Sequence, residues 1–160
     1  MKISTAKINA LTQDPRNARK HSSENLEAIK RSLKTFGQRK PIVVTSEGVV
    51  VAGNGTLESA KSLGWSEIFT VEIPSDWTED QVKAFAIADN RTAELAEWDS
   101  NLLATQLLEL EEIEFDLADV GFPKQDLDNE PEPEFPTYDD IKEATYKCPK
   151  CEYEWDGAPR

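Results

Sequence analysis

The segment that most constrains the fold is a pair of β-branched runs that leads into a glycine-rich turn and then a helix. The runs are PIVVTS at residues 41–46 and VVVA at residues 49–52, and the EG dipeptide between them is a hairpin signal. GNGT at residues 53–56 then breaks the strand pattern, and the apolar residues of LESAKSLG at residues 57–64 have helical spacing. We therefore expect a hairpin, a tight turn and a short helix in direct succession.

Helical and strand patterns continue on both sides of this segment. Apolar residues recur at helical spacing over residues 24–36, where Ser22 or Ser23 can cap the start and Gly37 fits the left-handed position after the end. The run IFTVEI at residues 68–73 predicts a further strand. A short strand or extended entry is expected at the beginning of the chain.

Two further helices are expected before the core closes near residue 122. The spacing T-x-x-Q from Thr78 to Gln81 is a capping-box signal, and the helix that it opens is expected to end near residues 89–91. Another helix is expected to start near residues 99–100, because a leucine stripe follows there at helical spacing. The predicted main domain is therefore residues 1–122.

The rest of the chain divides into a linker and a tail. Residues 123–145 are acidic and Pro-rich with little to bury, which predicts an extended or disordered linker. Residues 146–160 hold Cys148 and Cys151, whose spacing is that of half a zinc knuckle, since two thiolates supply half of a tetrahedral site. Three interpretations remain open: two chains share one zinc in a homodimer, a partner completes the knuckle, or the pair is a relic.

Charge is divided unevenly along the chain, whose formal net charge is −13. Residues 1–65 carry eleven Lys and Arg against five Asp and Glu, a net of +6, and residues 66–160 carry seven against twenty-six, a net of −19. This asymmetry favours a phosphate-binding site in the first half, although the acidic half can simply keep the chain soluble. No apolar run reaches the length of a membrane span, so we expect a cytoplasmic protein without a membrane partner.

The glycine-rich turn has the features of a phosphate cradle. The first amides of a helix have no intrahelical acceptor, and the helix dipole favours an anion beside them. Gly53 and Gly55 allow positive φ and close approach of a ligand, while Asn54 and Thr56 add side-chain donors. The alternative is a tight strand-to-helix turn that binds nothing.

Basic residues close to the turn in sequence favour the anion site, because guanidinium groups bind phosphate in bidentate fashion. The candidate cations lie in loops before a helix and before the hairpin, and are Arg16, Arg19, Lys20, Arg39 and Lys40. A solvated basic surface is the alternative. The tryptophans expected to pack in the core or an interface, with stacking on bases as the alternative, are Trp65, Trp77 and Trp98.

Three motifs in the right order resemble the ParB/sulfiredoxin-like superfamily. GQRKPIVV at residues 37–44 is similar to the G-x-x-x-P-[IL]-x-V end of its helix, and VVVAGNGTLESAKSLGW at residues 49–65 is similar to its hairpin and G-x-x-R-x-x-A box. The stretch from Ile87 to Leu110 is similar to the segment that follows the box in ParB-like nuclease domains of the phage and DNA-methyltransferase-associated type. The resemblance covers residues 3–122.

The resemblance implies an α+β fold in which helices pack on a small mixed sheet. It also implies that a nucleotide or nucleic-acid phosphate lies over residues 53–56. The ligand would face the loop that carries Arg16, Asn17 and Arg19. These residues, with Arg39 and Lys40, form the expected phosphate site.

Departures from the family pattern bear on the expected activity. Asn54 stands where relatives have Glu or His and Thr56 replaces the box arginine, which argues against a CTP-driven clamp. Sulfiredoxin activity is not expected, because its cysteine belongs in the box and both cysteines here lie in the tail. Kinase relatives keep a general-base carboxylate, for which Glu58 or Glu24 is the candidate, although glutamates on helix surfaces are usually solvated. Arg91 either reaches the ligand or pairs with a neighbouring acid.

The function expected from these observations is binding of a nucleotide, with or without Mg²⁺, or of DNA phosphate. The chain would be a phage-encoded module that acts in DNA modification, replication or partitioning beside a separate enzyme in the host cytoplasm. One alternative is an enzyme of the same superfamily, a nuclease or a nucleotide-dependent phosphotransferase. The other is an adaptor that binds a partner protein through its acidic tail.

Overall fold

The computed structural model describes residues 2–123, 145–147 and 150–156. The chain divides into two compact units, residues 1–128 and 129–160, which are considered separately. All but the end residues of the predicted linker, and the predicted zinc ligand Cys148, lie outside the described residues. None of the described helices combines the length and the apolar character that a membrane span requires.

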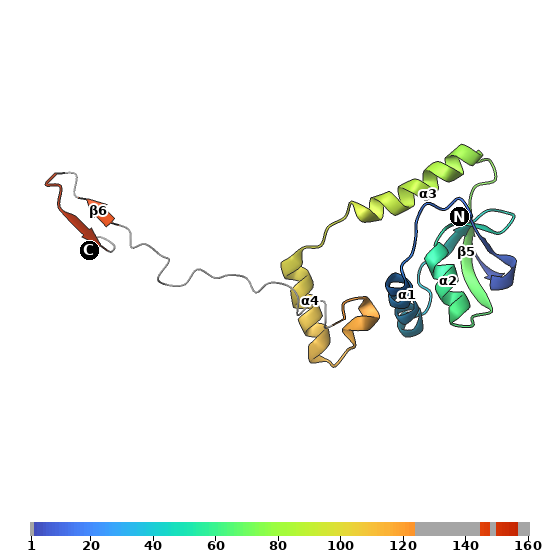
Figure 1. Ribbon diagram of the computed structural model, residues 1–160, viewed down its shortest axis with the longest axis horizontal. Coiled ribbons are helices and arrows are strands. Elements are labelled where there is room, and N and C mark those ends of the chain that lie inside the picture. The colour runs from blue at the N-terminus through green and yellow to red at the C-terminus, as the bar shows by residue number, and fades with distance from the viewer. Residues whose placement is uncertain (1, 124–144, 148–149, 157–160) are drawn as a thin grey trace. The chain divides into compact units, whose positions relative to one another are not determined.

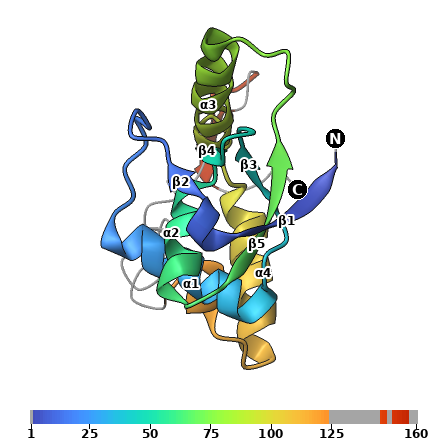
Figure 2. The same cartoon turned by 90° about the vertical axis from the view of Figure 1, so that its right-hand side faces the viewer.

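The first unit contains a five-stranded mixed sheet in the order β1-β5-β3-β4-β2 (Figure 2). Its strands are β1 (Ile3–Lys7), β2 (Thr12–Gln13), β3 (Ile42–Val44), β4 (Val49–Ala52) and β5 (Glu67–Glu72). β1 pairs antiparallel with β5 and β3 antiparallel with β4, whereas β3 pairs parallel with β5 and β2 parallel with β4. The predicted α+β class with a mixed sheet is confirmed.

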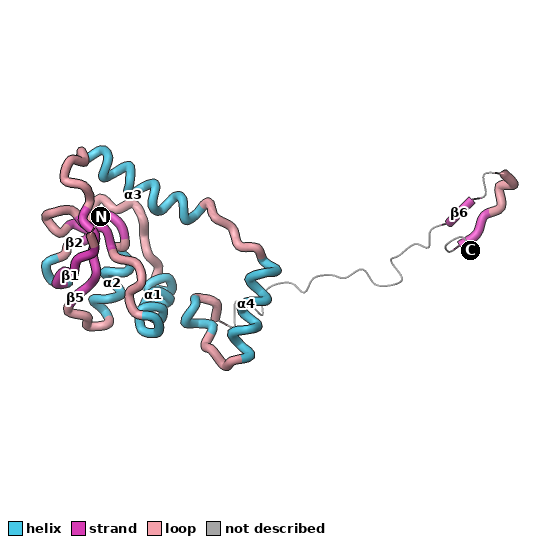
Figure 3. The backbone as a smooth tube through the Cα atoms, turned by 180° about the vertical axis from the view of Figure 1, so that it is seen from behind, coloured by secondary structure: helices cyan, strands magenta, loops and turns pink. Residues whose placement is uncertain are grey.

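Four α-helices and two short 3-10 turns accompany the sheet (Figure 1). They are η1 (Ile8–Ala10), α1 (Ser23–Phe36), α2 (Asn54–Ser62), α3 (Glu79–Glu94), α4 (Ser100–Glu112) and η2 (Leu117–Val120). α1 and α2 lie side by side next to the strands (Figure 3), and α2 also contacts β3. α3 contacts β4, and η2 contacts both α1 and α4.

The predicted helix starts are held by the local hydrogen bonds that the sequence indicates. Ser22 Oγ accepts from the amide of Asn25 at 3.1 Å at the start of α1. Thr78 and Gln81 form both bonds of a capping box at the start of α3, at 3.3 and 2.8 Å. Asp99 accepts from an amide in the first turn of α4. Each cap satisfies an amide that the helix itself leaves without an acceptor.

α2 begins at Asn54, three residues before the predicted start at Leu57. Gly53 is its N-cap with φ +94°, and the Gly53 carbonyl accepts from the amide of Leu57 at 3.0 Å. A Cβ on Gly53 would lie 2.6 Å from Cγ2 of Ile42, so both the left-handed backbone and the contact require glycine. The turn residues are therefore helical, and the amides without an intrahelical acceptor are those of residues 54–56 rather than those beginning at Leu57.

α3 continues to Glu94, past the end predicted near residues 89–91. Asn90 donates to the carbonyl of Ala86 at 2.8 Å, and Thr92 donates to the carbonyl of Ala88 at 2.9 Å. Their side chains therefore bond back along the helix instead of terminating it. The helix keeps its register for a further turn.

The core lies between α1, α2 and the sheet. Its fully buried centre consists of Val50 on β4 and of Leu57 and Ala60 on α2. Ser59 on α2 is also buried, and its hydroxyl donates to the carbonyl of Leu26 on α1 at 3.2 Å. The apolar face of α2 therefore fixes the position of the glycine-rich turn at its N-terminus relative to α1 and β4.

In the second unit, β6 (Thr145–Lys147) pairs antiparallel with β7 (Glu154–Asp156). Cys151 lies in the turn region between the two strands and is exposed. The described residues contain no group of three His, Cys, Asp or Glu side chains placed to hold a metal ion. Zinc binding by Cys148 and Cys151 stays a prediction.

Candidate anion-binding site

A cavity of about 190 Å³ lies at the N-terminus of α2. Its lining residues are Asn17, Arg19, His21, Ile29, Gly53, Asn54, Gly55, Thr56, Asp89 and Asn90. The cavity therefore brings the four residues of the glycine-rich turn together with Asn17 and Arg19 of the basic loop. The helix start supplies unpaired amides and the positive end of a dipole, and Arg19 supplies a cation.

His21 is a residue of this site that the sequence did not single out. A Cβ on Gly55 would lie 2.8 Å from Cε1 of the His21 ring, and the ring is held by a contact of 2.7 Å between Nδ1 and Oδ1 of Asn25. Gly55 has no positive φ, so it is needed here for the close approach of the ring rather than for its backbone conformation. The only sequence signal was the place of His21 directly before the cap of α1.

Asn54 anchors the turn with its side chain. The residue is buried, and its Nδ2 donates to the carbonyl of Val50 at 3.3 Å. Its Oδ1 is buried without a hydrogen-bond partner among the described residues. The side chain therefore already donates one hydrogen bond within the chain. Phosphate binding by Asn54 stays a prediction, and the other donors at the turn are main-chain amides and the hydroxyl of Thr56.

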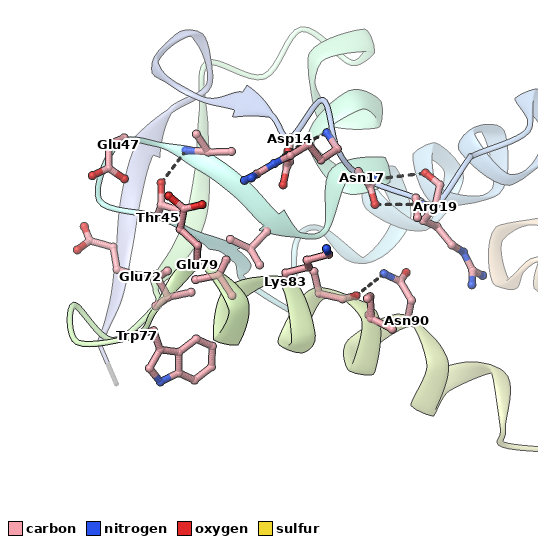
Figure 4. Close-up of a pocket in the computed structure, with 18 of the residues that line it drawn as sticks. Asp14, Asn17, Arg19, Thr45, Glu47, Glu72, Trp77, Glu79, Lys83 and Asn90 are labelled. Carbon is pink, nitrogen blue, oxygen red and sulfur yellow. Dashed lines mark hydrogen bonds and ion pairs between the residues drawn. The ribbon is translucent and has the colours of Figure 1, made fainter.

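The basic loop is held in shape by its own side chains. Oδ1 of Asp14 accepts from the amide of Arg16 at 2.9 Å, and Oδ1 of Asn17 accepts from the amide of Arg19 at 3.1 Å. Asn17 also donates to the carbonyl of Arg19 at 3.2 Å (Figure 4). These turns place Asn17 and Arg19 at the cavity, whereas the exposed Arg16 side chain pairs with Asp14 at 3.4 Å.

A second cavity, of about 1100 Å³, adjoins the first and shares Asn17, Arg19 and Asn90 with it. It lies between the basic loop, the β3–β4 turn, the segment after β5, and α3 (Figure 4). Lys83 extends from α3 into this space, and Trp77 lines it near the start of the helix. Lys83, Asp89 and Asn90 were not predicted, because their approach to the basic loop depends on how α3 packs.

Glu94 at the end of α3 pairs with two of the predicted cations. One carboxylate oxygen contacts Nη1 of Arg19, and the other lies 3.3 Å from Nη1 of Arg91. Arg91 therefore pairs with a neighbouring acid, which is one of the two interpretations left open by the sequence. It also lines the larger cavity, as Arg19 and Glu94 do.

The other candidates lie apart from the two cavities. Arg39 donates from Nε to the carbonyl of Phe36 at 2.6 Å, and neither Arg39 nor Lys40 is among the lining residues. Glu58 accepts from Nε2 of Gln13 at 3.3 Å and lines neither cavity, and the same holds for Glu24. Of the predicted site, the glycine-rich turn and the basic loop therefore meet at one cavity. Arg39, Lys40, Glu58 and Glu24 do not line it.

The fold of this domain is a mixed sheet whose hairpin leads into a glycine-capped helix. A polar loop faces the start of that helix. No family model matches the chain. It is 30% identical over 81 residues to the ParB-like nuclease domain-containing protein YnaK of Escherichia coli (strain K12), a match that covers 51% of this chain and 92% of YnaK. The chain belongs to the ParB-like nuclease domain family, in agreement with the resemblance of its motifs.

A solved structure of a chromosome-partitioning protein shares the fold. The C-terminally truncated chromosome-partitioning protein ParB from Caulobacter crescentus, complexed with CTP-gamma-S, superposes with a TM-score of 0.61 at 21% identity. That match covers 75% of this chain and 69% of the ParB chain. Sulfiredoxin from Arabidopsis thaliana matches with a TM-score of 0.44 at 15% identity, over 52% of this chain and 96% of that chain.

Proposed function

We propose that this domain binds a nucleotide, with its phosphates at the start of α2 and its nucleoside in the larger cavity. The observation that carries the proposal is the convergence of the α2 amides, Arg19 and Asn17 on one small cavity that adjoins a larger one. The first is of a size to take phosphate, and the second offers an apolar wall that includes Val49, Val51 and Ala86. The fold neighbour solved with CTP-gamma-S supports the same ligand class.

The charges around the larger cavity favour a compact nucleotide over a DNA strand. Its acidic lining residues are Asp14, Glu47, Glu72, Glu79 and Glu94, and its basic lining residues are Arg16, Arg19, Lys83 and Arg91. A surface that binds a nucleic-acid backbone is normally dominated by cations, because each neutralised phosphate contributes to affinity. Mixed charge of this kind instead suits a ligand whose phosphates are confined to one end.

A magnesium ion that accompanies the nucleotide would meet Asp89, the carboxylate in the lining of the small cavity. Mg²⁺ is commonly held by one or two carboxylates together with the phosphates of the ligand. The setting that we propose for the domain is DNA modification, replication or partitioning beside a separate enzyme, as the family resemblance implies. A phage origin and a cytoplasmic location belong to the same proposal.

A thermal-shift panel of nucleoside triphosphates, with and without Mg²⁺, tests this function in the full chain and two variants. Ligand that binds the folded state raises the unfolding temperature by mass action, so one nucleotide at 100 times its Kd should stabilise the wild type by about 2.7 kcal/mol. Arg19→Ala should lose most of that shift, because Arg19 lines both cavities. Arg39→Ala is the matched control and should keep the shift, because Arg39 lines neither.

Three results would contradict the proposal. The first is a panel in which no nucleotide stabilises the wild type, which would leave the cavity without a nucleotide ligand. The second is a shift that Arg39→Ala abolishes and Arg19→Ala preserves, which would locate the ligand elsewhere. A duplex oligonucleotide in the same panel distinguishes DNA binding from nucleotide binding. If DNA stabilises the wild type and no nucleotide does, DNA is the ligand.

A further inference from the structure

Glu94 holds the two guanidinium groups that border the proposed nucleotide site. Its carboxylate contacts Nη1 of Arg19 from the basic loop and Nη1 of Arg91 on its own helix, the latter at 3.3 Å. Arg19 and Glu94 are 75 residues apart in sequence, so this pair connects the basic loop to the end of α3. All three side chains are at least two-fifths exposed, so a ligand can reach them from solvent.

The Glu94 carboxylate already occupies a donor of Arg19 that an anionic ligand could use. A guanidinium offers the same donors to a carboxylate and to a phosphate, and it can bind either in bidentate fashion. Arg19 lines both cavities, so phosphate bound there must share Arg19 with Glu94 or displace it. Glu94 therefore competes with the ligand from within the chain.

We propose that Glu94 is an internal competitor that sets which anions the site accepts. The proposal rests on the proposed nucleotide function and names its ligand class: a terminal phosphate or polyphosphate, not a phosphodiester. A diester carries one negative charge, as the carboxylate does. A diester that displaces the Glu94 carboxylate therefore leaves the negative charge beside the two guanidinium groups unchanged. A terminal phosphate carries nearly two negative charges and a polyphosphate more, so the exchange is favourable for them.

The weakness of exposed ion pairs makes the exchange feasible. Pairs exposed to this degree are screened by water and contribute little individually, so displacement does not prevent binding but lowers its affinity. Two such pairs correspond to an affinity penalty of about fivefold. Removing the carboxylate should therefore raise the affinity for polyphosphate by that factor, and it should raise the affinity for the diester as well.

The test is isothermal titration of the full chain with inorganic tripolyphosphate and with the diester dTpdT. Glu94→Gln removes the charge and keeps the size of the side chain. We expect it to bind tripolyphosphate about fivefold tighter than the wild type. Its preference for tripolyphosphate over dTpdT should fall, and its affinity should decline more steeply with salt, because both guanidinium groups then start without a carboxylate.

Glu97→Gln is the matched control, because it makes the same change in charge three residues further on and Glu97 lines neither cavity. Its tripolyphosphate affinity and salt dependence should equal those of the wild type. Equal affinity of Glu94→Gln and the wild type would overturn the inference, and so would an equal gain in Glu97→Gln. Those results, in a protein that a nucleotide still stabilises, would leave the proposed function standing. If neither the wild type nor any variant binds tripolyphosphate, the inference about Glu94 is wrong. If, in addition, no nucleotide raises the unfolding temperature, the proposed nucleotide function is wrong as well.

Discussion

Replacing Gly53 with alanine should destabilise the domain through two separate effects at the start of α2. Gly53 has φ +94°, a left-handed conformation that costs an L-residue about 1–2 kcal/mol. Its new Cβ would also lie 2.6 Å from Cγ2 and 3.0 Å from Cβ of Ile42. Ile42 is buried on β3, and overpacking of a buried contact of this kind costs about 1–3 kcal/mol.

The two effects together predict a loss of about 3 kcal/mol in the free energy of unfolding. Gly64→Ala separates them, because Gly64 has φ +75° but no heavy atom lies within 4 Å of its Cβ position. That control should lose about 1 kcal/mol, from backbone conformation alone. The difference between the two variants is therefore the cost of the contact with Ile42.

Urea denaturation followed by tryptophan fluorescence measures both values, since Trp65 packs against the core and reports its loss. The midpoints should shift while the dependence of the free energy on urea stays constant, as expected when stability alone changes. Equal losses in Gly53→Ala and Gly64→Ala would refute the reasoning. They would mean that β3 and the glycine-rich turn do not approach as closely as the structure shows.

Two further predictions concern local interactions. Thr78→Ala should remove the capping box with Gln81 and cost α3 about 1 kcal/mol of local stability. Amide hydrogen exchange in the first turns of α3 should become faster in Thr78→Ala and stay unchanged in the control Thr92→Ala. Unchanged exchange in Thr78→Ala would contradict this prediction. The hydrogen bond from Lys30 and the charge of Lys30 lower the pKa of Glu27, so Lys30→Gln should raise that pKa in an NMR titration of the carboxyl. Because the folded pKa is depressed, the contribution of Glu27 to stability is present above its unfolded pKa and is lost as pH falls through the folded pKa. An unaltered Glu27 pKa in the variant would rule out Lys30 as the cause.

The part of the structure that sequence predicted well consists of elements defined by neighbouring residues. The caps Ser22, Thr78 and Asp99 and the β3–β4 hairpin depend on hydrogen bonds between residues a few positions apart. Where sequence failed, the same local signals were ambiguous. The side chain of Asn90 can end a helix or bond back along it. Here it donates to the carbonyl of Ala86, and α3 continues to Glu94.

The candidate site was predictable in its centre and not in its surroundings. The glycine-rich turn and the basic loop each carry a recognisable chemistry, and both line the small cavity. Arg39 carries the same chemistry but bonds to the end of α1 instead, because a cation near the turn in sequence need not face it in space. Lys83 and Asp89 line the cavities from α3, where Arg91 was the residue predicted as a possible ligand contact.

By itself, the amino-acid sequence determined the order of α1 to α4 with β3, β4 and β5, the glycine at the start of α2 and the supply of cations before α1, because these follow from local geometry and residue type. The short strand β2 (Thr12–Gln13) was not predicted. Only the tertiary structure decided that His21 packs on Gly55, and that Glu94 holds Arg19 across 75 residues of chain. Those contacts depend on the packing of α1, α2 and α3 around the sheet. Long-range packing of this kind is set by buried area summed over many residues, so no single motif encodes it.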